Sequence, residues 1–122
     1  MTTIANAVFD SGLSTLTTNG TRIDICSTEP TTYAQATSTY TLGNESSLSI
    51  ASPSDRSGGG REVAVGAVTD ASVTGTGTAA FYAITDGSSN LYVTGDLSAS
   101  QSVTSGNTFS LGSFTIGIPD PA

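Results

Sequence analysis

The chain has 122 residues, a net charge of −7 and only 11% charged residues, with three arginines and no lysine. This length predicts a single domain over residues 1–122 that can bury a core without disulfides or metals. Three cations argue against nucleic acid or an anionic membrane as partner, because both require a basic patch. The N-terminus has neither the basic start nor the continuous apolar run of a secretory signal, which favours synthesis in a cytosol.

The first predicted element is a short amphipathic helix over residues 3–18. Apolar residues recur there at helical spacing, and Asn19-Gly20 supplies a stop of the kind found at helix C-termini. A short strand is predicted over residues 22–27, where isoleucines alternate with polar side chains. Residues 31–44 have no firm period, and we interpret them as either a loop or a weak turn of helix.

The middle of the chain predicts short strands separated by a glycine-rich loop. Residues 48–50 alternate as a short strand does, and residues 54–60 (S-D-R-S-G-G-G) are typical of an exposed connection. A strand is predicted over residues 61–68, with a change of register at Gly66 that brings its last valine inward. Another short strand is predicted to begin at Val73.

The last third, residues 77–118, alternates with period two between turn residues, which predicts consecutive antiparallel strands in a meander. The strand around residues 80–84 carries apolar side chains on both parities, so we expect it to be buried on both faces. A slip of parity at residues 112–113 predicts a β-bulge. The predicted fold is therefore mainly β, an antiparallel β-sandwich or barrel-like domain with one short N-terminal α-helix.

The residues that could carry chemistry are few. The chain has no histidine, which excludes imidazole-based triads and histidine-ligated zinc. Cys26 lacks a basic partner of the usual type, so we interpret it as a buried structural thiol. The acidic residues fall mostly at turns, and residues 86–90 (D-G-S-S-N) favour a hairpin turn over a calcium loop. The sequence thus predicts a protein that is not an enzyme and has no cofactor or metal.

The glycine run between Ser57 and Arg61 lacks the Gly-Lys-Ser/Thr ending of a phosphate-binding loop. One interpretation is a mobile connection. The other is a segment that becomes ordered against a partner, with Arg56 and Arg61 supplying mobile positive charges.

The order of these elements resembles a known group of proteins. The resemblance covers residues 4–118 and rests on the runs S-T-E-P-T-T-Y (27–33), G-G-G-R-E-V (58–63), F-Y-A-I-T-D (81–86), L-Y-V-T-G-D-L (91–97), V-T-S-G-N-T-F (103–109) and F-T-I-G-I (114–118). With these runs the chain resembles small virion proteins of tailed bacteriophages, of the capsid decoration and tail-fibre-like kinds.

The resemblance implies a noncatalytic virion protein made in the bacterial cytoplasm. We expect a capsid decoration (cement) protein that binds the major capsid protein and further copies of itself on the capsid surface. The alternatives are a tail- or fibre-associated protein, or a receptor- or glycan-binding β-sandwich in which four tyrosines would offer stacking faces. Exposed strand edges are expected to contribute contacts. The residues predicted to bind a partner are Ile4, Val8, Arg56, Gly58, Gly59, Gly60 and Arg61.

Overall fold

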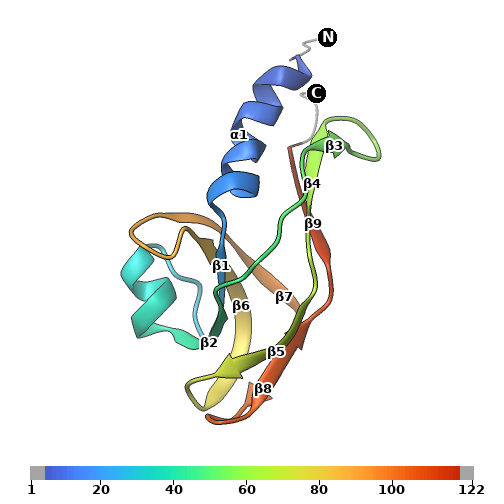
Figure 1. The fold of residues 1–122 in the computed structure, drawn as a ribbon. Helices are drawn as coiled ribbons and strands as arrows, with labels where there is room; N and C mark the ends of the chain where they lie inside the picture. Colours follow the sequence, from blue (N-terminus) through green and yellow to red (C-terminus); the bar gives the residue numbers. More distant parts are fainter. Residues whose placement is uncertain (1–4, 119–122) are drawn as a thin grey trace.

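The computed structural model describes residues 5–118, apart from the side chains of Asn6 and Ser98. The fold is mainly β, with two antiparallel sheets in a sandwich-like arrangement that does not close into a barrel (Figure 1). A six-stranded sheet has the order β7-β6-β1-β2-β5-β8, and a three-stranded sheet has the order β3-β4-β9. One α-helix precedes the strands. The predicted fold class is confirmed.

The elements follow one another along the chain with short connections. In chain order they are α1 (Asn6–Asn19), β1 (Arg22–Cys26), the π-helix η1 (Gln35–Thr39), β2 (Thr41–Glu45), β3 (Ser54–Asp55), β4 (Arg61–Val65), β5 (Val68–Val73), β6 (Gly77–Thr85), β7 (Leu91–Val103), β8 (Thr108–Leu111) and β9 (Phe114–Ile118). None of the helices within residues 5–118 is long and apolar enough to span a membrane.

Helix α1 forms where the sequence predicts it and lies beside the three-stranded sheet (Figure 1). Phe9, Leu13 and Leu16 are buried, and their spacing of four and three residues places them on one face of the helix. The Gly20 N–H donates to the Leu16 carbonyl at 2.8 Å and ends the helix, as the Asn19-Gly20 pair predicts. On the other side, Val8 is 62% exposed.

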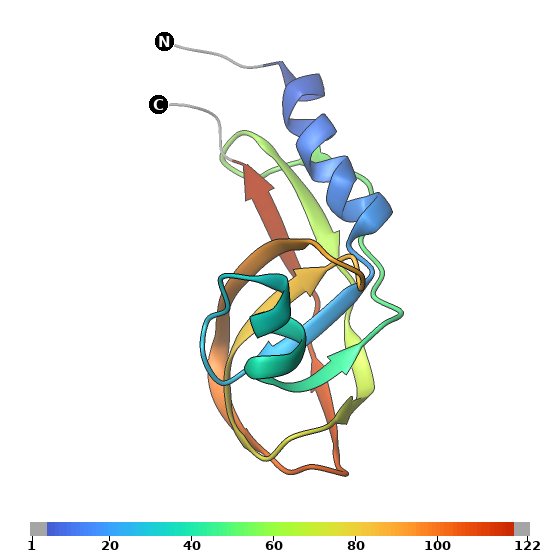
Figure 2. The same cartoon turned by 90° about the vertical axis from the view of Figure 1, so that its left-hand side faces the viewer.

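Strand β6 is buried on both faces, as predicted. Ile84 belongs to the main core between the sheets, and Tyr82 packs against that core. Ala83 and Phe81 belong to a second, smaller cluster on the opposite face, which Cys26 and other residues complete. Helix η1 covers this second face and lies across β1 in Figure 2. Apolar side chains at both odd and even positions of a strand are typical of strands that are covered on both faces.

Three predictions for the middle of the chain are wrong in detail. The interval predicted as loop or helix contains η1 but also strand β2, and residues 48–50 contribute only a single bridge from Ile50 to Val65. Strand β5 ends at Val73, where a strand was predicted to begin. The sequence around β2 reads as a turn because of Gly43. That glycine lies in the strand because a Cβ there would be 2.7 Å from the Ser72 carbonyl oxygen.

The predicted meander holds only for the β6–β7 hairpin. Strand β8 pairs with β5, and β9 pairs with β4, so the four-residue turn after Val103 takes the chain from one edge strand of the six-stranded sheet, β7, to the other, β8. The expected bulge at residues 112–113 is a complete break between β8 and β9, and Gly66 marks the matching break between β4 and β5. At each break the buried side chains change from one set of alternate positions to the other. The paired strands β4 and β9 of the three-stranded sheet therefore continue as the paired strands β5 and β8 of the six-stranded sheet.

Candidate functional site: an apolar seam beside β9

The predicted partner-binding residues are brought together only in part. Arg56, the three glycines and Arg61 form the β3–β4 hairpin, in which Asp55 pairs with Arg61. Val8 lies on α1, and Ile4 lies outside the described residues. Contact of these residues with a partner stays a prediction. The structure shows how Arg61 and the three glycines are held.

Arg61 is not a mobile charge, contrary to the expectation from the sequence. Its Nε donates to Asp10 Oδ1 at 2.9 Å, and its Nη1 donates to Asp55 Oδ1 at 2.6 Å. Its Nη2 also donates to the Pro53 carbonyl at 3.3 Å. Hydrogen bonds to Asp10 and then to Asp55 raise the pKa of the guanidinium above its usual value. The side chain therefore ties α1 to the β3–β4 hairpin.

The glycine run closes that hairpin in a defined geometry. Gly58, Gly59 and Gly60 have φ angles of +89°, +105° and +94°, a region that other residues rarely adopt. The Arg56 N–H donates to the Gly60 carbonyl at 3.0 Å, and the Arg56 guanidinium donates to the Gly59 carbonyl at 3.1 Å. Three consecutive positive φ angles explain why the sequence has three glycines here.

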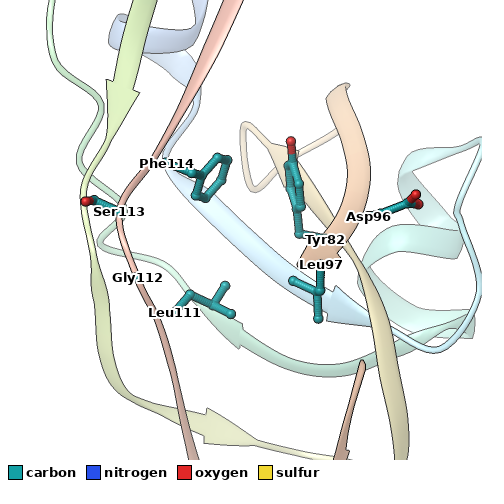
Figure 3. A pocket seen from close by; sticks show the side chains of 7 residues that line it. All are labelled: Tyr82, Asp96, Leu97, Leu111, Gly112, Ser113 and Phe114. Atoms are coloured by element: carbon teal, nitrogen blue, oxygen red, sulfur yellow. The ribbon is translucent and has the colours of Figure 1, made fainter. Parts of the chain in front are cut away.

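Two cavities lie along one side of β8 and β9. The first, of about 400 Å³, is lined by Tyr82, Asp96, Leu97, Leu111, Gly112, Ser113 and Phe114 (Figure 3). The second, of about 290 Å³, lies between α1, the start of β7 and β9 and is lined by Gly12, Leu13, Thr15, Leu16, Tyr92, Val93, Ile116 and Ile118. We call these two cavities the seam, together with β7 and β9, which border both, and β8, which borders the first.

The strands that border the seam are edge strands. Within residues 5–118, β7 pairs only with β6, β8 only with β5 and β9 only with β4. The backbone N–H and C=O groups on their other sides are therefore left without a strand partner. Residues 108–118 contain no charged residue and no proline. Soluble proteins usually protect such edges with lysine, proline or other charges.

An aromatic pair crosses the seam. The rings of Tyr82 from β6 and Phe114 from β9 have centroids 4.8 Å apart and are tilted by 53°. Figure 3 shows the two rings facing one another, with Leu97 and Leu111 below them and the Asp96 carboxylate directed away. Burial, and next the charge of Asp96, raise the pKa of Tyr82.

Gly95 stands opposite Tyr82 on β7. A Cβ at this position would lie 2.7 Å from three atoms of the Tyr82 side chain. The tyrosine therefore covers the glycine and extends from there toward Phe114. The position of this ring at the seam depends on the lack of a side chain at residue 95.

The buried ionisable groups serve the fold. Asp24 is fully buried and accepts hydrogen bonds from Arg22 Nε at 2.8 Å, Arg22 Nη2 at 3.0 Å and Thr41 Oγ1 at 2.7 Å. The role of Asp24 does not follow from the sequence, because alternation alone does not show that the polar face of β1 is covered. Cys26 is buried, as predicted, and its burial, followed by the charge of Asp24, raises the thiol pKa to about 12.

The hairpin interpretation of residues 86–90 is confirmed. The Asp86 carboxylate accepts backbone N–H bonds from Ser88, Ser89 and Asn90 at 2.8, 2.9 and 3.0 Å. These bonds lower the pKa of Asp86 to about 2. In the part of the chain that the structure describes, no three His, Cys, Asp or Glu side chains are grouped so that they could hold a metal ion.

No family model, curated protein or solved structure matches this chain. The seam is thus defined by its geometry alone. The sequence carries one signal of the seam: no charged residue occurs between Asp96 and Asp120. If the strands in this stretch lie at sheet edges, the lack of charged residues leaves those edges without the side chains that usually prevent pairing with other chains.

Proposed function

We propose that this chain is a non-enzymatic structural protein of a tailed bacteriophage, a decoration protein that binds the outer surface of the assembled head and stabilises it. The observation that carries the proposal is the uncharged edge of β8–β9, which has no strand partner within residues 5–118 and lies beside two apolar cavities. Such an edge is suited to contact with another protein chain. The resemblance of the sequence to phage virion proteins supplies the biological setting.

A decoration protein acts by mass action. If it binds the assembled shell and not the separate capsid subunits, each bound copy shifts the equilibrium toward the shell. Binding of several copies around a local symmetry axis would add contacts between the copies themselves. The net charge of −7 favours a neutral or basic shell surface, since opposite potentials steer association and equal ones oppose it.

The second set of contacts in this proposal lies on α1 and the glycine hairpin, next to the second cavity. Val8 is an exposed apolar residue on α1, and the glycine hairpin is tied to that helix through Arg61 and Asp10. Because this ion pair fixes the hairpin relative to the helix, the two form one surface. We place the contacts predicted from the sequence on this surface.

The experiment is a co-sedimentation of purified protein with phage heads that lack it, alongside unassembled capsid subunits. We expect saturable binding to the heads, little binding to the subunits, and heads that withstand a higher temperature when decorated. Imaging of complete virions gives an independent answer. Density for this chain on the tail alone would transfer the proposal to a tail- or fibre-associated protein.

A separate experiment distinguishes the glycan-binding alternative from the decoration protein. Tyr82 and Tyr92 pack against the main core and Tyr40 against the smaller one, so their rings contribute to packing. A glycan array with specific hits, combined with no binding to heads, would favour that alternative over the decoration protein.

A further inference from the structure

We propose that the seam receives an extended segment of the partner protein, which pairs with the free edge of β9 and places two apolar side chains in the two cavities. The segment is neutral or net basic. The chemistry of the segment follows from the seam itself, and only its assignment to a capsid protein rests on the proposed function.

The first argument is the backbone. Strand β9 pairs with β4 through all five of its residues, from Phe114 opposite Val65 to Ile118 opposite Arg61. Its other side has no strand neighbour in the described part of the chain. An extended peptide is the ligand that satisfies such a row of N–H and C=O groups, as in strand addition to an exposed sheet edge.

The second argument is the placement of the cavities. Both border the same edge: on β9 the first is lined by Phe114 and the second by Ile116 and Ile118. Phe114 and Ile118 are four residues apart along this strand, or about 13 Å at 3.3 Å per residue. An even separation matters, because only residues an even number apart point to the same face of a strand. The segment should therefore carry apolar residues at positions i and i+4.

The third argument is charge. Asp96 is exposed at the first cavity, and residues 108–118 carry no charge. Of the three arginines, Arg22 and Arg61 are already paired with carboxylates. A second copy of this chain would add another −7 to the complex, which opposes association. The charges thus favour a segment from a different protein with a neutral or positive balance.

The test uses synthetic nine-residue peptides with a fluorescent label. The first has leucine at its third and seventh positions, threonine between them and lysine at both ends, so that both leucines share a face. The control peptide has the same composition with leucine at its third and sixth positions, which places them on opposite faces. We expect saturable binding of the first peptide and binding of the control weaker by about tenfold or more, because one leucine then stays in water.

Variants locate the binding. Ser113 lines the first cavity and is exposed, whereas Ser46 is exposed just after β2 and lies outside both cavities and the glycine hairpin. Ser113→Lys should weaken the first peptide by about tenfold or more, because it places a like charge beside the lysine-flanked strand. Ser46→Lys, with the same change in charge, should leave binding unchanged.

A second pair of variants tests the same cavity if Ser113→Lys does not fold. Asp96→Lys changes an exposed residue of the first cavity, and Glu29→Lys makes the same change at an exposed residue that lines neither cavity. We expect weaker peptide binding for Asp96→Lys alone. Equal binding of the two peptides, no binding of either, or equal effects of the paired variants would overturn the proposal. Heads that still bind the protein in that case would leave the proposed function standing, with its contacts elsewhere.

Discussion

Arg61 of β4 and Asp10 of α1 are joined by two hydrogen bonds, Nε to Oδ1 at 2.9 Å and Nη2 to Oδ2 at 3.3 Å. The two residues are 51 positions apart in the chain. This pair, with the Thr17 hydroxyl that donates to the Ala51 carbonyl at 2.8 Å, links the N-terminal helix to the segments around the three-stranded sheet. The placement of α1 therefore depends partly on charge.

Removal of this charge should loosen the helix. In Asp10→Asn the carboxylate that Arg61 binds through two nitrogens is lost, so we expect faster amide exchange in α1 and a lower denaturation midpoint. The difference from the native protein should decrease with added salt, since part of Arg61 and Asp10 is reached by solvent. Unchanged exchange in α1 would show that its apolar face alone holds it. Ser11→Asn, at the adjacent exposed position, is the control.

The second prediction concerns Asp24, whose side chain is fully buried and accepts three hydrogen bonds. Asp24→Asn removes the negative charge that Arg22 and Thr41 face, and it introduces an amide donor where donors already point. We expect a loss of about 2 kcal/mol or more in the free energy of unfolding, measured by urea denaturation. The exposed Asp96→Asn is the matched control and should stay within about 0.5 kcal/mol of the native protein. Similar losses in both variants would contradict a special role for Asp24.

The third prediction concerns pH. The pKa of Asp86 is lowered from its usual 3.8 to about 2, because the folded hairpin donates backbone N–H bonds to the ionised carboxylate. The folded protein therefore holds this proton less tightly than the unfolded chain. Its contribution to stability is complete above about pH 4 and is lost as the pH falls toward 2.

The variant Asp86→Asn keeps an oxygen acceptor at this turn but does not titrate. The gap in unfolding free energy between native protein and variant should narrow steadily as the pH falls through this window. A gap that stays constant from pH 5 to pH 2 would contradict the assignment of the lowered pKa to Asp86.

The fourth prediction separates two glycines. A Cβ at Gly43 would lie 2.7 Å from the Ser72 carbonyl oxygen and 2.9 Å from the Phe109 ring, whereas a Cβ at Gly12 would meet nothing within 4 Å. Gly43→Ala should destabilise the protein by about 1–3 kcal/mol through overpacking. Gly12→Ala lies within α1 and should stabilise it by about 0.5–1 kcal/mol. Thermal denaturation of both variants checks the signs, and equal shifts would contradict the packing around β2.

Local patterns in the sequence were enough to predict several elements. The helix was predicted from the spacing of its apolar residues, which are Ile4, Val8, Leu13 and Leu16 with Phe9 beside them, although Val8 is exposed in the structure. The β6–β7 hairpin was predicted from alternation around a turn. The burial of β6 on both faces was predicted because apolar residues stand at both odd and even positions of this strand. These features depend on residues close in the chain, where periodicity carries the information.

The features that escaped prediction depend on distant partners. The pairing of β8 with β5, and of β9 with β4, is set by which apolar faces meet in the folded core, and alternation is equally consistent with a meander. Gly43 resembled a turn because the atoms that exclude a side chain there come from Ser72 and Phe109. Arg61 resembled a free cation because Asp10 is far away in sequence. For the same reason, the seam was not predicted before the edges were known.

The most direct test of the central claim measures the affinity of phage heads for the native protein, Ser113→Lys and Ser46→Lys by co-sedimentation. Ser46 is exposed and lies outside both cavities and the glycine hairpin, so we expect the native protein and Ser46→Lys to bind alike and Ser113→Lys to bind more weakly by about tenfold or more. Equal binding of all three proteins would contradict the seam as the contact surface. Failure of the native protein to sediment with the heads would contradict the decoration function itself.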